Sequence, residues 1–171
     1  MIRPLTLAAV AAFALAAPSQ AQVRVLFQES APKDRFTLIN EGRCTFEGLT
    51  AEIDLSSAAG GLIFDVTGAG AGVEVFQPLE MAEGDVQPAG EVRDGDSTLR
   101  LALGPLGPGE RAAVTIDVDD TLRNGELGQI RVAGAEIQGG RVILTAEGGL
   151  SAEGAFGSDA VAVLQVSACA V

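Results

Sequence analysis

The densest group of potential ligand residues is an acidic stretch in the last third of the chain. Asp117, Asp119 and Asp120 lie next to one another, and Asn124 follows shortly afterwards. Calcium takes roughly six to eight hard oxygen ligands, and clustered carboxylates at a strand end supply several of them. The stretch is therefore a candidate calcium site, to which folding would have to add further carboxylates such as Asp94 and Asp96. A solvated acidic turn is the interpretation that the sequence favours.

The acidic stretch is not an EF-hand loop. Counted from Asp117, the sixth position is Leu122, where that loop needs a glycine, and the twelfth is Gly128, where it needs a bidentate glutamate. A calcium site here would instead be of the loop type found in β-sandwich adhesion modules, assembled from segments that are distant in the sequence.

The residue types that are missing argue against an enzyme. The chain has no histidine, which removes Ser-His-Asp and Cys-His sites and zinc sites with histidine ligands, and two cysteines are too few for a structural zinc. Paired carboxylates can hydrolyse glycosides, but there is no tryptophan or tyrosine to stack on a sugar ring. We therefore expect no catalytic residues, and a carboxylate-based hydrolase is the weakest hypothesis.

The N-terminal segment is typical of an export signal. Arg3 precedes an apolar run over residues 5–17, and Ser19 and Ala21 are small residues where a signal peptidase requires them. We predict a signal peptide over residues 1–21, cleaved after Ala21, and a single domain over residues 22–171. The run is shorter than the roughly 20 residues that span a bilayer, and no longer one follows. The expected location is the periplasm or the medium, with no membrane span after cleavage.

The two cysteines are expected to pair in an oxidising compartment. Cys44 and Cys169 lie near opposite ends of the predicted domain. A bond between them would close a loop that the chain-entropy model values at about 5 kcal/mol. Two buried thiols are the alternative.

The secondary-structure elements that would position these residues are predicted to be strands. In Ala113–Val118, apolar residues alternate with Ala113, Thr115 and Asp117, so one face is buried and the other is wet. Short runs of this kind are separated by Gly, Pro, Asn and Asp turns, which predicts an all-β, antiparallel β-sandwich. The predicted strands are Val23–Gln28, Phe36–Asn40, Cys44–Leu55 with a bulge at Gly48, Leu62–Thr67, Val73–Pro78, Thr98–Leu103, Ala112–Val118, Gln129–Ala133, Val142–Ala146 and Val161–Val166.

Two resemblances refine this picture. The Pro-Gly turn in Leu103–Glu110, with the alternating strand after it, resembles a junction in immunoglobulin-like modules of bacterial surface proteins. Separately, Ala31–Phe36, Gly60–Pro78 and Thr115–Thr121 resemble small exported bacterial proteins labelled aggregation-factor core, after a sponge cell-adhesion proteoglycan. The first resemblance implies an immunoglobulin-like sandwich. The second implies a secreted, adhesive protein without assigned catalytic residues.

The charge narrows the class of partner. The formal net charge is -12, and removal of the signal would take away only Arg3 among the charged residues. Such a surface repels nucleic acid and attracts cations or basic partners. The leading hypothesis is therefore a non-enzymatic surface, matrix or adhesive module that binds a protein partner or a cell-surface matrix. The alternative is a calcium-dependent binding module that uses the acidic stretch, with calcium as its only cofactor.

Overall fold

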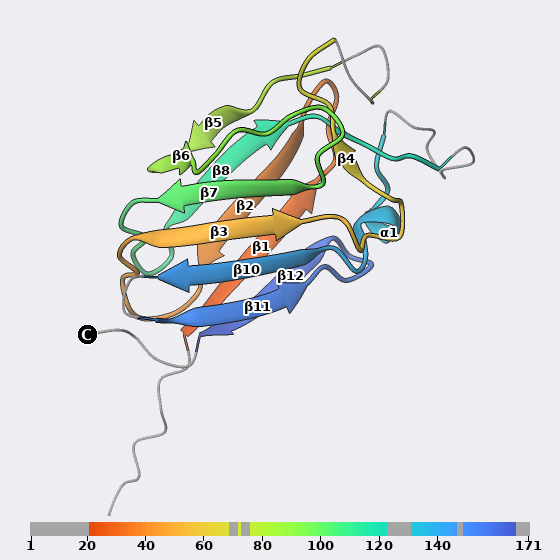
Figure 1. Ribbon diagram of the computed structural model, residues 1–171. Coiled ribbons are helices and arrows are strands. Elements are labelled where there is room, and N and C mark those ends of the chain that lie inside the picture. Colours follow the sequence, from red (N-terminus) through yellow and green to blue (C-terminus); the bar gives the residue numbers. More distant parts are fainter. Residues whose placement is uncertain (1–20, 69–71, 73–75, 123–130, 147–148, 167–171) are drawn as a thin grey trace, which may run out of the picture.

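The protein folds as a sandwich of two antiparallel sheets. The computed structural model describes residues 21–68, 72, 76–122, 131–146 and 149–166. Within them, two five-stranded sheets pack face to face, which confirms the predicted all-β sandwich (Figure 1). A helix and a two-stranded ribbon lie together at one end of the sheets (Figure 1).

The strand order within each sheet brings together segments distant in the sequence. The first sheet runs, in spatial order, through β12 (Val161–Val166), β1 (Ala21–Gln28), β2 (Asp34–Asn40), β8 (Arg111–Ile116) and β5 (Glu80–Glu83). The second runs through β11 (Ser151–Ala155), β10 (Arg141–Ala146), β3 (Leu49–Asp54), β7 (Thr98–Leu103) and β6 (Val86–Pro88). The ribbon pairs β4 (Ile63–Phe64) with β9 (Val118–Asp119), and the helix is α1 (Gly134–Ile137).

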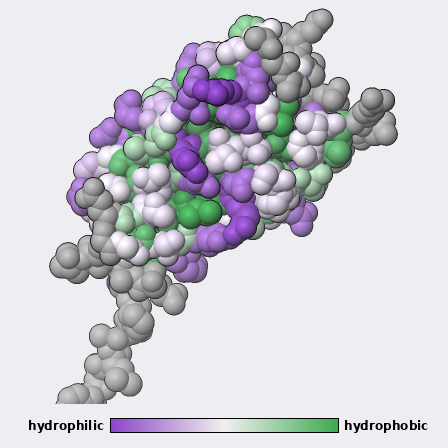
Figure 2. Space-filling model, viewed as in Figure 1, coloured by the Kyte–Doolittle hydropathy of each residue, from purple (hydrophilic) through white to green (hydrophobic). Residues whose placement is uncertain are grey.

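Alternation of apolar and polar residues explains why each sheet has one buried face. Along β3, every second residue from Leu49 is buried, and the residues between them are partly exposed. On the outer face of this sheet, Glu52 pairs with Arg100 at 2.7 Å. Hydrophilic residues are spread over much of the described part of this face (Figure 2). Exposed ion pairs contribute little stability, so the inner face provides the driving force.

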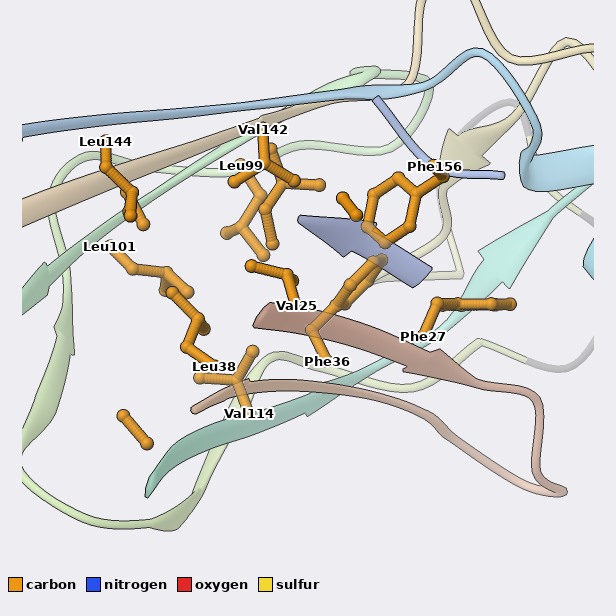
Figure 3. Packing of buried hydrophobic residues seen from close by; sticks show 14 of the residues in the cluster. Val25, Phe27, Phe36, Leu38, Leu99, Leu101, Val114, Val142, Leu144 and Phe156 are labelled. Carbon is orange, nitrogen blue, oxygen red and sulfur yellow. The ribbon is translucent and has the colours of Figure 1, made fainter. Parts of the chain in front are cut away.

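The core contains a cluster of phenylalanine rings at the end of the sandwich near the ribbon. The Phe36 ring has its centroid 5.1 Å from that of Phe27 and 6.3 Å from that of Phe156 (Figure 3). The centroid of the Phe64 ring is 6.5 Å from that of Phe36. Phe64 belongs to β4, so the ribbon is attached to the core through this ring. Tilted and edge-on ring pairs of this kind add to the stability gained from burial alone.

Several predicted strands are confirmed with small differences at their ends. Thr98–Leu103 and Val161–Val166 have the predicted bounds as β7 and β12. The long strand predicted from Cys44 is a regular strand only from Leu49, because Gly48 has a φ of 57° and breaks the extended path. The strand predicted over Ala112–Val118 is divided at Asp117 into β8 and β9.

Two predicted strands are wrong over the residues that the structure describes. Phe76–Pro78 and Arg131–Ala133 are not strands, and residues 73–75 and 129–130 lie outside the described residues. The chain enters α1 directly after Ala133. Three strands were not predicted, namely β5, β6 and β11. All four residues of β5 are exposed, β6 contains a proline, and β11 is built mostly from small residues, so none shows a clear apolar alternation.

The predicted disulfide and export signal are only partly within the described residues. Cys44 packs against the core. Asn40 Nδ2 donates hydrogen bonds to the carbonyl oxygen of Cys44 at 2.7 Å and to the carbonyl oxygen of Leu106 at 2.9 Å. No described cysteine is a free thiol. Cys169 lies outside the described residues, so its pairing with Cys44 stays a prediction, as does the signal over residues 1–21. Where the structure describes the chain, no helix is long and apolar enough to cross a membrane.

Candidate functional site

The three predicted aspartates are buried. Asp117 links β8 to β9, Asp119 ends β9, and Asp120 follows it. Their exposed fractions are 4, 1 and 2 %, respectively, so the alternative of a solvated acidic turn is wrong for these residues. Because side chains alternate along an extended chain, Asp117 and Asp119 lie on one side of the strand and Asp120 on the other, with Val118.

A fourth buried carboxylate comes from the neighbouring strand of the ribbon. Ile63 pairs with Asp119 and Phe64 with Val118, which places Asp65 opposite Asp117. The Asp65 N–H donates to the Asp117 carbonyl oxygen at 3.2 Å, and the Asp65 side chain is 1 % exposed. Directly opposed residues share one face of a ribbon. One face of β4–β9 therefore carries Asp65, Asp117 and Asp119, which we call the aspartate face.

Asp34 braces this arrangement from the first sheet. It opens β2, is 3 % exposed, and accepts hydrogen bonds from the backbone N–H groups of Ser30 at 3.1 Å and Val118 at 3.0 Å. Burial raises the pKa of Asp34 to about 8. The two backbone hydrogen bonds act in the opposite direction, and the charges of Asp117 and Glu29 add to the rise. Asp34 thus fixes the start of β9 at an electrostatic cost that grows with its ionisation.

Asp117 has electrostatically unfavourable surroundings on the aspartate face. Its pKa is raised to about 7, mainly by burial and in addition by the negative charges of Asp119 and Asp65. Its Oδ2 atom is buried and has no hydrogen-bond partner. A buried carboxylate oxygen without a donor is costly, and the cost increases when other carboxylates lie nearby.

Asp120 belongs to different surroundings from the other two predicted ligands. Its Oδ1 accepts a hydrogen bond from the Leu122 N–H at 2.8 Å. Burial raises its pKa, and the charge of Glu136 in α1 contributes. Glu136 itself accepts a hydrogen bond from the Ala133 N–H at 2.6 Å, at the start of α1. The structure therefore separates Asp120 from Asp117 and Asp119, and Asn124 lies outside the described residues.

Asp94 and Asp96 hold the strand that carries Asp65. Asp94 Oδ1 accepts hydrogen bonds from the N–H groups of Val66 at 2.8 Å and Thr67 at 2.7 Å. The Phe64 N–H donates to the Asp96 carbonyl oxygen at 2.8 Å. β4 therefore lies between this loop on one side and β9 on the other. The hydrogen bonds give Asp94 a structural role next to the aspartate face.

A glycine packs directly against Asp65. A Cβ atom at Gly72 would lie 2.0 Å from Asp65 Oδ2, closer than any real contact. We predict that Gly72→Ala displaces the Asp65 carboxylate and lowers the free energy of unfolding by about 1–3 kcal/mol, as overpacking does. Gly68→Ala is the matched control, because its Cβ would meet only the ring of Phe76, which is 41 % exposed. Thermal unfolding of both variants is the measurement, and equal melting temperatures would contradict the prediction.

Sequence reasoning missed Asp34 and Asp65. Each interrupts or opens an apolar strand, and an acidic residue in such a position was the available signal. Nothing local in the sequence shows that β2, β4 and β9 meet. These strands meet because of the sheet topology, which pairs residues more than fifty positions apart in the sequence.

The described carboxylates do not form a ready-made metal centre. Among the described residues, no three acidic, histidine or cysteine side chains are already grouped so that they would hold a metal ion. The side chains present on the aspartate face are all oxygen ligands, which suits a hard cation such as calcium better than a transition metal. Comparison of the chain with protein-family models, curated proteins and solved structures gives no match.

Proposed function

We propose that this protein is an exported, non-enzymatic module that acts on a surface or in a matrix by contacting other proteins. The observation that carries the proposal is strand β5, which forms one edge of the first sheet. All four residues, Glu80–Glu83, are exposed, and the strand pairs with β8 on its inner side. The outer edge of such a strand offers backbone groups to a partner strand.

The side chains of β5 indicate the chemistry of the partner. Met81 is 37 % exposed, and the strand that contains it begins with Glu80 and ends with Glu83. These two glutamates pair with Lys33 at 2.6 Å and Arg35 at 2.7 Å, respectively. The strand also has an irregular register between Met81 and Glu83, a feature that protects edges against self-association. With the net charge of -12, this favours a basic partner over a second copy of the chain.

The surface pocket beside β7 supports binding over hydrolysis. It has a volume of about 430 Å³, and its acidic side chains already have partners. Glu52 pairs with Arg100, Glu91 pairs with Arg93, and Asp96 accepts the Arg93 backbone N–H. A general acid needs a raised pKa, whereas Arg93 lowers the pKa of Glu91. The carboxyl groups with raised pKa lie elsewhere, buried around β2 and β9, so they do not face each other across this pocket.

A lysine substitution in β5 tests whether this edge strand contacts the partner. Met81→Lys adds a positive charge to β5 and is expected to reduce attachment of producing cells to one another, or to a surface, at least fivefold. Val163→Lys on β12 is the matched control, because Val163 is also a singly exposed apolar residue, at 41 %. Equal attachment by the two variants and the unmodified protein would overturn the assignment of β5. Unchanged attachment after deletion of the protein would overturn the adhesive function itself.

A calcium-dependent binding module is the second candidate function. The specific observation in its favour is the aspartate face, where three carboxylates are buried side by side. Calcium would offset two of their three negative charges and would connect the stability of the ribbon to the calcium concentration outside the cell.

The location and the covalent bond are also inferred. We infer that the signal is removed after Ala21, that the product is periplasmic or secreted, and that Cys44 pairs with Cys169. The absence of a free thiol among the described cysteines supports the last inference. The resemblance to aggregation-factor core proteins and to immunoglobulin-like modules supports the adhesive function.

A further inference from the structure

The second sheet has an edge that β6 covers only in part. β6 pairs with residues 101–103 of β7 and therefore leaves the first half of that strand uncovered. Beyond β6, the Ala89 N–H donates to the Arg100 carbonyl oxygen at 2.9 Å. Among the described residues, none after Ala89 pairs with β7 on this side. The beginning of β7 is thus an open edge in the line that β6 would follow if it were longer.

The backbone of Thr98 faces this open edge. On the other side of the strand, the Leu55 N–H donates to the Ser97 carbonyl oxygen at 2.7 Å, next to β3. Successive residues of an antiparallel strand direct their backbone groups to opposite sides, so the N–H and C=O of Thr98 point away from β3. No backbone group of the described chain is hydrogen-bonded to Thr98 there. An extended peptide that continues the line of β6 would find a donor and an acceptor.

The pocket beside β7 lies at this open edge. Its lining consists of residues 89–92 and 95–100 together with Glu52, and its volume is about 430 Å³. Pockets that bind ligands usually have volumes of roughly 300–1,000 Å³. The uncovered backbone of β7 therefore forms one wall of a cavity that can hold a short segment of extended chain.

The charges around the pocket favour a basic segment. Three acidic side chains and one basic side chain line it, namely Glu52, Glu91, Asp96 and Arg100. Arg93 donates both of its hydrogen bonds to Oε2 of Glu91, and Arg100 donates to Oε2 of Glu52. Neither pair uses Oε1, which leaves that oxygen of each glutamate available to a second cation. Exposed ion pairs contribute little stability, so an arginine or lysine of a partner can join or replace them.

We propose that the pocket beside β7 binds an extended, basic peptide segment of a partner protein, which pairs with Thr98 as an added strand and directs an arginine or lysine side chain toward Glu91 and Glu52. This inference rests on the proposed function and adds a second contact to it, on the other sheet. β5 and β6 end their two sheets on the same side of the sandwich, so one partner can reach both contacts (Figure 1). The net charge of -12 argues against a second copy of the chain as the occupant.

The test is a peptide titration of the protein expressed from the whole chain. The probe is a short fluorescent peptide of alternating threonine and arginine, and fluorescence anisotropy gives its dissociation constant. We expect saturable binding of this peptide and none of a peptide of alternating threonine and glutamate. The basic peptide with an N-methylated backbone has the same charge but no backbone donors, and we expect its affinity to be lower by about tenfold or more.

Two variants distinguish the pocket from general attraction between opposite charges. Glu91→Lys is expected to weaken binding of the basic peptide about fivefold or more, whereas Glu153→Lys changes it less than about twofold. The two glutamates are matched, because each is at least half exposed and pairs with an arginine. Glu153 lies in β11, at the opposite edge of the same sheet. Melting curves establish that both variants fold.

Each contrary result contradicts a different part of the inference. Equal weakening by Glu91→Lys and Glu153→Lys would overturn the pocket as the binding site. Equal affinity for the basic peptide and its N-methylated form would overturn the added strand. If the basic peptide does not bind while Met81→Lys still reduces attachment, the inference is wrong and the proposed function stands.

Discussion

Without metal, raising the pH from about 4 to about 8 is expected to lower the free energy of unfolding by several kcal/mol. In the folded protein, burial raises the pKa of Asp34 to about 8 and that of Asp117 to about 7. In the unfolded chain both groups ionise near pH 4. The folded state therefore holds more protons than the unfolded state between these values, and its stability falls as the pH rises. Asp34 alone accounts for at most about 5 kcal/mol of this loss.

Asp34→Asn isolates the contribution of that group. An amide does not titrate, so the variant is expected to lose a large part of the slope of stability against pH between about 4 and 8. The charged groups that act together with Asp34 are Asp117, Glu29 and Arg131. Glu29 and Asp54 have lowered pKa values and influence the curve only near and below pH 4. Urea unfolding in buffers across this range is the measurement, and a flat profile for the unmodified protein would contradict the expectation.

Phe36→Ala is expected to be a strongly destabilising substitution in the core. Phe36 is fully buried, and its ring contacts those of Phe27, Phe64 and Phe156. Removal of a buried phenylalanine ring typically costs about 3–5 kcal/mol, because the contacts are lost and a cavity remains. The measurement is chemical or thermal unfolding followed by circular dichroism.

Phe76→Ala is the control for that experiment. Phe76 is 41 % exposed, and substitutions at such positions usually change stability by less than about 0.5 kcal/mol. A loss for Phe36→Ala no larger than that for Phe76→Ala would contradict the central position of Phe36 in the core.

The sequence predicts the strands that alternate and misses those that do not. β7 and β12 were predicted with their observed bounds because each has a buried residue at every second position. β5 has no buried residue, so its strand conformation comes from pairing with β8 and not from a local pattern. The break at Asp117 was also invisible, since the residues on both sides continue the same alternation. In such segments, pairing with strands distant in the sequence determines where a strand begins and ends.

The candidate site was predicted in part for the same reason. Adjacent carboxylates at Asp117 and Asp119 are a local signal, and both lie on the aspartate face. Burial could not be read from them, because acidic residues are usually solvated and only the sheet topology shows that β2 and β4 cover them. Asp65 lies on the aspartate face because β4 pairs with β9, and neither segment alone predicts that pairing. Asp120 leaves it because the side-chain alternation turns it toward Glu136.

The most direct test of the account is a titration of the aspartate side chains in the metal-free protein. Carbon-13 NMR of the carboxyl groups, followed from about pH 3 to pH 9, reports the pKa of each one. We expect Asp34 to titrate near 8 and Asp117 near 7, both well above the usual value for an aspartate side chain, which is about 4. If every aspartate instead titrates below about pH 5, the carboxylates around β9 are solvated, and the aspartate face is not the buried cluster described above.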